Sequence, residues 1–194
     1  WLNNKNNFRE YSRQQALLGF KYLFFKSAKL LIPNLEFNDL LECKKVGIRP
    51  QIILSGRKTN DQMHKYVLRK LQKKLNLKTF SKLNVLIMGY TFKENCSDFR
   101  NTKIQDLYLT LKSKFKVVNV FDPYINLAKS KKINDVNFIQ NLKKLKYDVV
   151  LIAVGHDYFK KLGIKKIRSI LKNNNSIIFD LKYLFKIKET DLQL

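Results

Sequence analysis

The sequence predicts an α/β fold: a Rossmann-like, doubly wound parallel sheet, preceded by a long connecting helix and a helical N-terminal extension. Short runs that are almost wholly apolar, such as 84–88 and 148–154, alternate with segments of helical periodicity. This pattern is typical of parallel strands that are covered on both faces. The first run also stops at Gly89 and opens into a polar loop. Because such sheets bind ligands at the carboxyl ends of their strands, we expect this loop to form the site.

The first 50 residues predict helices but no catalytic arrangement. One helix is expected from Ser12 to about Leu31, where Pro33 ends it, and a shorter one from Glu36 to Lys45. Lysines interrupt the most apolar early segment, 17–32, so we interpret it as a packing helix and not as a membrane anchor. Because the chain begins with Trp1, we expect it to be a piece of a longer protein.

A long helix is expected next, from Ile52 to about Leu75. Its apolar residues recur at steps of three and four positions, and Pro50 stands just before its start. Lysines and arginine near its end complement the helix dipole. A long helix before an α/β domain is either a spine or dimer contact, or simply a packing helix, and the sequence leaves these interpretations open.

From residue 83 onward, strands and helices are expected to alternate. The predicted strands are 84–88, 117–120, 136–139, 148–154 and 176–179, and the predicted helices are 103–113, 158–162 and 164–171. Thr102, with Gln105 three residues later, predicts a capping box at the first of these helices. We therefore place a connecting helix over residues 51–76 and the sheet domain over residues 77–194.

The chain is strongly basic. Its 194 residues include 39 Lys+Arg against 15 Asp+Glu, a formal net charge of +24. Such an excess is typical of proteins that bind nucleic acid, anionic membranes or phosphate-bearing ligands. The lysines are spread over the whole chain as short pairs, however, so we interpret them as solvated faces and predict neither a nucleic-acid nor a membrane partner.

The two cysteines, Cys43 and Cys96, do not make a disulfide framework. A reducing cytoplasm is therefore the expected location. Cys96 stands near Lys93, which lowers a thiol pKa when the two groups are close. Because no general base lies near it in the sequence, we interpret Cys96 as an inert thiol, and we assign no catalytic residue and no metal ligand.

Two cations mark the loop after the first strand. Lys93 and Arg100 both fall where a sheet of this class opens its crevice. Lysine is a mobile point charge that suits a phosphate or sugar oxygen, and arginine offers a planar fork. Asp98 stands between them, and an ion pair with either cation is the alternative interpretation. The lone Gly89 is not followed by the G-x-G-x-x-G pattern of dinucleotide-binding loops.

Two further polar residues follow later strands. Asp122 follows the second strand, where acids often contact a ribose, but the Pro123 after it equally indicates a structural turn. His156 follows the strand at 148–154 and faces the same crevice. A single histidine in this position is more often a hydrogen-bonded structural residue than an acid or base, and we interpret it so.

These segments together resemble the C-terminal domain of the UDP-glucose/GDP-mannose dehydrogenases. The resemblance rests on Gly89-Tyr-Thr-Phe92-Lys93-Glu-Asn95-Cys96-Ser-Asp98-Phe-Arg100-Asn101-Thr102, Phe121-Asp122-Pro123, Val154-Gly-His156-Asp-Tyr-Phe159 and Phe179-Asp180-Leu-Lys182. Within the family, the sequence is most similar to the UDP-N-acetylhexosamine 6-dehydrogenases of surface polysaccharide synthesis. Residues 53–63 resemble the helix that joins the middle domain to the C-terminal domain.

The resemblance implies a function and a set of site residues. Members of the family oxidise a nucleotide sugar at C6 in two NAD-dependent steps, using a Rossmann domain for NAD and a middle domain with the catalytic cysteine and the dimer contacts. The resemblance assigns Phe92, Lys93 and Lys182 to the UDP-sugar substrate and Arg100 to NAD. It also implies a homodimer.

The departures from the family are equally informative. The neighbours of Cys43 differ from the family's cysteine motif, and residues 1–50 are interpreted as a partial or divergent remnant of the middle domain. We therefore expect these 194 residues alone to produce no NADH from UDP-N-acetylglucosamine and NAD. The alternatives are a non-catalytic module that binds a UDP-sugar and a basic domain that binds nucleic acid.

Overall fold

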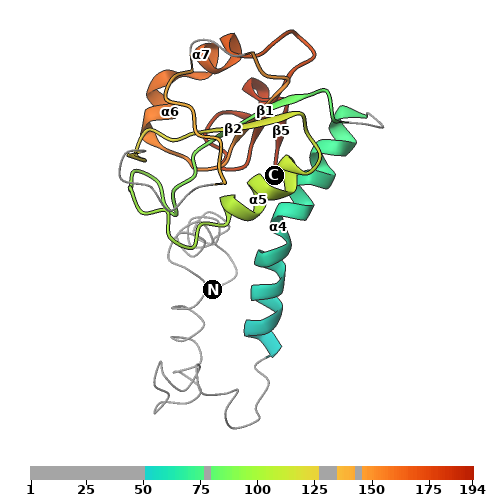
Figure 1. Ribbon diagram of the computed structural model, residues 1–194, viewed down its shortest axis with the longest axis vertical. Coiled ribbons are helices and arrows are strands. Elements are labelled where there is room, and N and C mark those ends of the chain that lie inside the picture. Colours follow the sequence, from blue (N-terminus) through green and yellow to red (C-terminus); the bar gives the residue numbers. More distant parts are fainter. Residues whose placement is uncertain (1–50, 77–79, 127–134, 143–145) are drawn as a thin grey trace, which may run out of the picture. The chain divides into compact units, whose positions relative to one another are not determined.

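The computed structural model describes residues 51–76, 80–126, 135–142 and 146–194 (Figure 1). The chain divides into two compact units, residues 1–57 and residues 58–194. All the strands described belong to the second unit. The helices expected at 12–31 and 36–45, and the apolar segment 17–32, lie outside the described residues.

The sheet has five strands that are all parallel, in the order β2-β1-β3-β4-β5. The strands are β1 (Asn84–Met88), β2 (Val117–Phe121), β3 (Val149–Ile152), β4 (Ile177–Asp180) and β5 (Leu192–Gln193). The first four were predicted from their apolar runs, with boundaries that differ by two residues at most. The predicted strand 136–139 is reduced to a single parallel bridge between Phe138 and Val120.

The helices predicted after residue 50 are also present, with small shifts at their ends. They are α4 (Gln51–Leu75), α5 (Ile104–Lys112), α6 (Asp157–Leu162) and α7 (Ile164–Ser169), and a short 3₁₀ helix η1 (Ile187–Glu189) precedes β5. Among the described helices, none is both long enough and apolar enough to cross a membrane.

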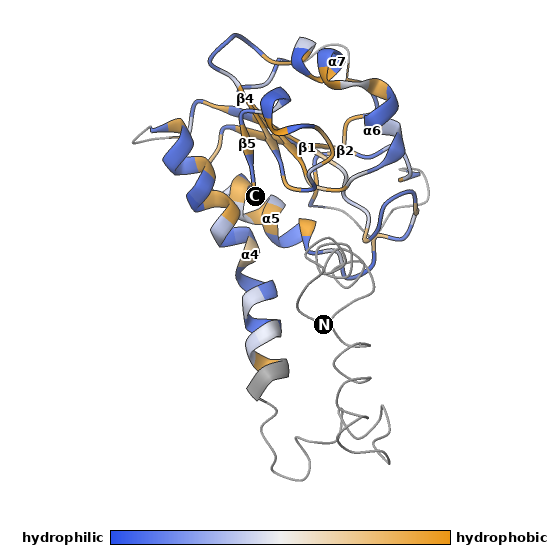
Figure 2. Ribbon diagram, turned by 180° about the vertical axis from the view of Figure 1, so that it is seen from behind, coloured by the Kyte–Doolittle hydropathy of each residue, from blue (hydrophilic) through white to orange (hydrophobic). Residues whose placement is uncertain are grey.

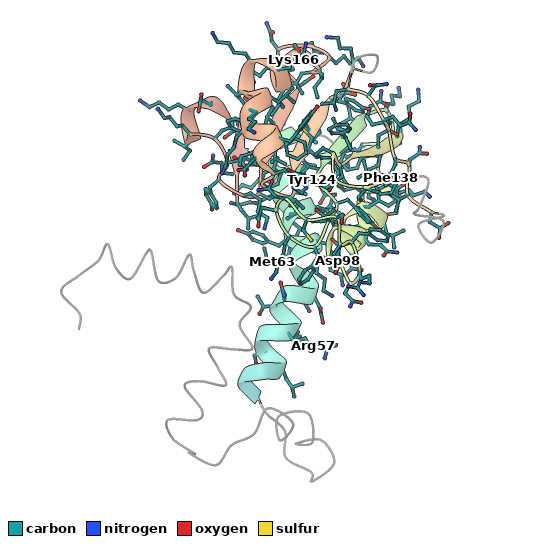
Figure 3. All side chains as sticks on the ribbon, turned by 90° about the vertical axis from the view of Figure 1, so that its left-hand side faces the viewer. Arg57, Met63, Asp98, Tyr124, Phe138 and Lys166 are labelled. Atoms are coloured by element: carbon teal, nitrogen blue, oxygen red, sulfur yellow. The ribbon has the colours of Figure 1, made fainter. Side chains whose placement is uncertain are left out.

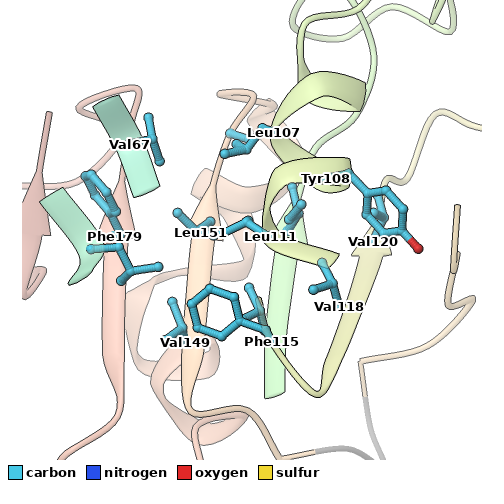
Figure 4. Packing of buried hydrophobic residues seen from close by; sticks show 14 of the residues in the cluster. Val67, Leu107, Tyr108, Leu111, Phe115, Val118, Val120, Val149, Leu151 and Phe179 are labelled. Carbon is cyan, nitrogen blue, oxygen red and sulfur yellow. The ribbon is translucent and has the colours of Figure 1, made fainter. Parts of the chain in front are cut away.

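The two faces of the sheet bury separate apolar clusters, because side chains alternate along a strand. In β1, Val85 and Ile87 pack in one cluster, while Leu86 and Met88 pack in the other. Figure 4 shows the first cluster, in which Val118, Leu151 and Phe179 lie against α4 and α5. The second cluster includes Phe159 of α6 and Ile167 of α7. Helices therefore cover both faces, which confirms the predicted doubly wound architecture.

The hydropathy pattern agrees with this arrangement. The strands are coloured as hydrophobic in Figure 2, and the strand residues 85–88 and 149–152 are all fully buried. Helix α4 carries many hydrophilic residues, and it contributes Val67 and Leu71 to the core of the second unit. Burial of side chains of this size stabilises a fold by about 1.5–3 kcal/mol each.

The predicted capping box is wrong. Helix α5 begins at Ile104 with Lys103 as its N-cap residue, so Gln105 is the second helical residue and not the third. A capping box requires the glutamine at the third position, from which it reaches back to the cap. Thr102 instead accepts a hydrogen bond from the Ile104 N–H, at 3.2 Å.

Candidate functional site

The order of the strands defines a crevice between β1 and β3. The chain moves from β1 to β2 on one side and reaches β3 on the other side. In sheets with this order, ligands bind outside the carboxyl ends of the strands at the point where the direction reverses. The loop that follows β1 and the residues 153–156 that follow β3 border this crevice.

Gly89 makes the close approach of β1 and β3 possible. Its φ of +91° is a conformation that side-chain-bearing residues rarely adopt. A Cβ atom at this position would lie 2.5 Å from the Cβ of Val154 and 2.8 Å from its backbone nitrogen. The backbone turn and the close packing at the base of the crevice therefore explain why a glycine stands at position 89. A role in binding a phosphate group is not required for it.

Asp122 ties the end of β2 to the end of β1. Its Oδ2 accepts hydrogen bonds from the N–H groups of Tyr90 and Thr91, at 2.7 and 3.0 Å, and its Oδ1 accepts one from Tyr124 N–H at 2.8 Å. Burial raises the pKa of Asp122, but the hydrogen bonds from His156 and these amides outweigh it, so the pKa lies below the ordinary value. These contacts favour the structural turn over the ribose contact.

His156 is completely buried at the carboxyl end of β3. Its Nδ1 accepts a hydrogen bond from the Asn95 N–H at 2.9 Å. Its Nε2 lies 3.1 Å from Asp122 Oδ2 and 3.2 Å from Thr91 Oγ1. Both ring nitrogens are engaged, so the geometry agrees with the interpretation of His156 as a hydrogen-bonded residue.

Asn95 fastens the loop after β1 to the start of α6. It has a φ of +57°, which asparagine tolerates better than most residues. Its side-chain oxygen accepts hydrogen bonds from Asp157 N–H at 2.9 Å and from the Tyr124 hydroxyl at 3.1 Å. Its amide nitrogen donates to Asp157 Oδ2 at 2.7 Å. The sequence prediction did not single out Asn95, because its partners lie 62 and 29 residues away.

Lys93 and Phe92 lie on the exposed side of this loop. The Lys93 ammonium lies 6.0 Å from the centre of the Phe92 ring, and Phe92 is 56% exposed. Within the part of the chain that the structure describes, no carboxylate pairs with Lys93. The lysine charge is therefore available to an anionic ligand.

Lys182 reaches the same crevice from the end of β4. Its Nζ lies 3.6 Å from a carboxylate oxygen of Glu94. A Cβ atom placed on Gly155 would lie 3.6 Å from the Lys182 Cβ and 3.7 Å from the Glu94 Cγ. The loops after β1, β3 and β4 therefore meet at this point. The loop after β1 carries Phe92 and Lys93 and the loop after β4 carries Lys182, so all three predicted substrate residues lie on two of these loops.

Asp180 determines the path of the chain at Lys182. It is fully buried, and its two carboxylate oxygens accept hydrogen bonds from the N–H groups of Lys182 and Phe185, at 2.9 and 3.0 Å. Tyr183 follows in a left-handed conformation with a φ of +54°. This conformation is rare for an aromatic residue and is typical of backbone that the surroundings hold in place.

Arg100 is held by an acid of its own loop, Asp98. Its Nε and Nη2 donate to the two oxygens of Asp98, each at 2.9 Å, and its side chain is 82% exposed. The hydrogen bonds from Arg100 lower the pKa of Asp98 to about 2. Figure 3 labels Asp98, and also Tyr124 in the loop after β2. Of the two predicted partners for Asp98, the structure therefore selects Arg100.

The remaining features offer no other chemistry in the described residues. Cys96 is a free, half-buried thiol whose sulfur lies 3.4 Å from the Asp98 N–H. No group of three or more His, Cys, Asp or Glu side chains among the described residues is arranged to hold a metal ion. Two surface hollows of about 480 and 470 Å³ are lined by other residues than Lys93 and Lys182.

The chain is similar to several proteins of known activity. It is 36% identical over 151 residues to UDP-N-acetyl-D-glucosamine 6-dehydrogenase of Salmonella typhi, an alignment that covers 77% of this chain and 35% of that protein. It is also 36% identical over 155 residues to the enzyme of the same name from Pseudomonas aeruginosa, covering 79% of this chain and 36% of that protein. The chain thus spans about a third of the length of these curated relatives.

Solved structures share the fold. A UDP-glucose dehydrogenase from Pyrobaculum islandicum superimposes with a TM-score of 0.62 at 19% identity, over 81% of this chain and 34% of that one. An NDP-N-acetyl-D-galactosaminuronic acid dehydrogenase from Methanosarcina mazei gives a TM-score of 0.62 at 23% identity, over 73% and 30%.

The family match falls on the sheet and its loops. Residues 86–187 match the family described as "UDP-glucose/GDP-mannose dehydrogenase family, UDP binding domain". This range includes the crevice loops and both lysines that border them. The chain therefore belongs to the UDP-glucose/GDP-mannose dehydrogenase family, and its residues 86–187 are the UDP binding domain of that family.

Proposed function

We propose that the crevice between β1 and β3 binds the UDP part of a UDP-sugar, with Lys93, Phe92 and Lys182 as its contacts. The observation that carries this proposal is the ammonium of Lys93, with which no carboxylate among the described residues pairs, at the crevice of a UDP binding domain. A diphosphate is doubly anionic or more, so a lysine from each side of the crevice would complement it. The exposed Phe92 ring offers an apolar surface to the same ligand.

NAD fits this sheet poorly as a primary site. Gly89 is a single glycine that packs against Val154, so no glycine-rich loop is present to admit a pyrophosphate. Asp122, at the position where an acid contacts a ribose, already accepts four hydrogen bonds. We therefore propose that Arg100 contributes a single contact to an NAD molecule held mainly by another part of the protein.

The whole protein is proposed to oxidise a UDP-sugar with NAD to a UDP-uronic acid for polysaccharide biosynthesis. The names of the relatives from Salmonella typhi and Pseudomonas aeruginosa support this proposal. We further propose that residues 51–76 are the connecting helix and residues 77–194 the UDP-sugar domain, and that the protein works as a homodimer in the cytoplasm. The role of this chain in the reaction is to bind and orient the nucleotide, and the residues that we assign to it transfer no hydride.

Titration of the 194-residue chain with UDP tests the proposed site. Replacement of Lys93 by alanine removes a charged hydrogen-bond donor that contributes about 1.5–3 kcal/mol, so we expect the dissociation constant to rise roughly tenfold or more. Isothermal titration calorimetry at fixed ionic strength measures this change. Lys114→Ala is the matched control, because Lys114 is also exposed but precedes β2 at the opposite edge of the sheet.

Two outcomes would contradict the proposal. A Lys93→Ala variant that binds UDP as tightly as the wild type would remove Lys93 from the site. Tight binding of duplex DNA with a steep dependence on salt would instead favour the nucleic-acid interpretation of the basic charge, because phosphate-backbone binding weakens strongly with ionic strength.

A second prediction concerns the acid that faces Lys182. Replacement of Glu94 by glutamine removes a negative charge next to the proposed diphosphate and releases Lys182 from its ion pair at 3.6 Å. We expect UDP to bind a few-fold more tightly, with the gain largest at low salt because exposed charges are screened at high salt. Calorimetric titration at two ionic strengths checks both points, and weaker UDP binding would show that Glu94 itself contacts the ligand.

A further inference from the structure

We propose that His156 is a positioning residue that sets the conformation of the segment 91–95 and thereby presents Lys93 to the nucleotide. The effect of His156 on UDP binding rests on the proposed function. Its effect on the loop conformation rests on the hydrogen bonds of His156 with Thr91 and with Asn95. His156 touches no ligand in this proposal and is not a catalytic residue.

The hydrogen bonds determine where the proton of the imidazole resides. The Asn95 N–H is a donor, so Nδ1 of His156 must be the unprotonated nitrogen that accepts it. The proton of a neutral ring then lies on Nε2, which faces the carboxylate of Asp122 at 3.1 Å. The hydroxyl of Thr91 donates its own proton to the Lys93 carbonyl at 3.1 Å, so it accepts from Nε2. Each group therefore has one consistent role.

This network holds the backbone on both sides of Lys93. On one side, the Thr91 hydroxyl is bonded to the Lys93 carbonyl and to His156. On the other side, the Asn95 N–H is bonded to His156 directly. Among the described residues, the segment 90–96 has one hydrogen bond between backbone groups, from Phe92 N–H to the Asp98 carbonyl at 2.7 Å. Side chains from the ends of β2 and β3 therefore provide most of its anchoring.

The surroundings of the imidazole hold it in one orientation. The ring of Tyr124 lies 4.9 Å from it and the ring of Phe159 lies 5.4 Å from it, between centroids. Asp122 is the charged group in contact with it, and the side chain is completely buried. Because neither nitrogen is exposed, His156 cannot transfer a proton to a ligand in this conformation, and its effect on the site must pass through the loop.

Two conservative variants separate the functions of the two nitrogens. Asparagine places a polar atom near the position of Nδ1, so His156→Asn keeps an acceptor for the Asn95 N–H and loses the donor to Asp122. Glutamine reaches the position of Nε2, so His156→Gln keeps that donor and loses the acceptor. We expect His156→Gln to weaken UDP binding by the 194-residue chain about tenfold, and His156→Asn to restore much of it.

A double-mutant cycle tests whether the effect passes through Lys93. We expect the loss caused by His156→Gln to vanish when Lys93 is already alanine, because a misplaced lysine and an absent lysine are equivalent to the ligand. Thr91→Val is a second variant with the same expectation, since valine has a similar volume and leaves the imidazole unchanged. An equal loss with and without Lys93 would overturn the proposal and leave His156 as a general structural residue.

Nuclear magnetic resonance of the ligand-free chain provides a readout that does not depend on UDP. We expect ¹⁵N spectra to show His156 with an unprotonated, hydrogen-bonded Nδ1 and a protonated Nε2. We also expect the Asn95 amide to exchange slowly in the wild type and His156→Asn, and quickly in His156→Gln. The opposite tautomer, or an Asn95 amide that exchanges equally fast in all three proteins, would overturn the proposal.

The two measurements distinguish the possible failures. If the wild type shows the expected tautomer and amide protection but does not bind UDP, the proposed function is wrong and the conformational role of His156 stands. If the wild type binds UDP and the cycle shows no coupling, the proposed function stands and the positioning role is wrong.

Discussion

Replacement of Gly89 by alanine is expected to lower the free energy of unfolding by roughly 2–5 kcal/mol. The new Cβ would lie 2.5 Å from the Val154 Cβ and 2.8 Å from the Val154 backbone nitrogen, at a φ of +91°. The first contact overpacks the base of the crevice, and the second involves backbone that cannot rotate away. Because small domains are stable by about 5–15 kcal/mol, urea unfolding followed by circular dichroism should show a large shift of the midpoint.

Gly155 provides the matched control for this prediction. It stands in the loop after β3, and a Cβ atom there would make ordinary contacts of 3.5 to 3.7 Å with Leu184, Lys182 and Glu94. We expect Gly155→Ala to change the free energy of unfolding by less than about 1 kcal/mol. If the two variants were equally stable, the close packing of β1 against the loop after β3 would not be essential to the fold.

The sheet was predictable from sequence because its strands are buried on both faces. A run such as 84–88 is almost entirely apolar, and its boundaries were predicted to the residue. Strand β5 was missed because Leu192–Gln193 is only two residues long and half-buried, so it carries no apolar run. The start of α5 was predicted one residue too early, because a threonine just before a helical segment is typical of an N-cap residue. In the structure, Thr102 accepts a local hydrogen bond from Ile104 N–H, and Lys103 is the N-cap residue.

The positions of the two lysines were also predictable, but their partners were not. Lys93 and Lys182 follow parallel strands, so both necessarily lie at the carboxyl edge of the sheet. Lys182 and Glu94 pair although they lie on different loops and are 88 residues apart in the sequence. No local pattern encodes such a pairing, and the same reason explains why Asn95 was not recognised.

The two interpretations that the sequence left open at Asp122 differ in their physical requirements. A ribose contact needs free carboxylate lone pairs, whereas a structural turn uses them within the protein. The structure shows both oxygens accepting hydrogen bonds, from Tyr90, Thr91 and His156 at Oδ2 and from Tyr124 at Oδ1. The choice between the interpretations therefore depended on the ends of three strands, which only the folded chain brings together.

Replacement of Asp122 by alanine is expected to lower the free energy of unfolding by roughly 3–5 kcal/mol. The Asp122 side chain is fully buried, and its loss would leave the N–H groups of Tyr90 and Thr91 without their acceptor in a buried site. Asp106→Ala is the control, because Asp106 is half-exposed and pairs with Lys103 at 3.5 Å. We expect that variant to change stability by less than about 1 kcal/mol, and urea unfolding at pH 7 measures both.

The pH dependence tests the charge of Asp122 directly. Its pKa in the folded chain lies below the ordinary value of 3.8, so the unfolded chain takes up a proton first as the pH falls. The stabilisation from the ionised carboxylate is therefore fully present above pH 3.8 and is lost as the pH falls through the folded pKa. We expect the difference in unfolding free energy between the wild type and Asp122→Ala to be constant at neutral pH and to shrink below that value. If the difference in unfolding free energy stayed the same well below pH 3.8, the charge of Asp122 would not be what holds the ends of β1, β2 and β3 together. The size and shape of the side chain would then account for its effect.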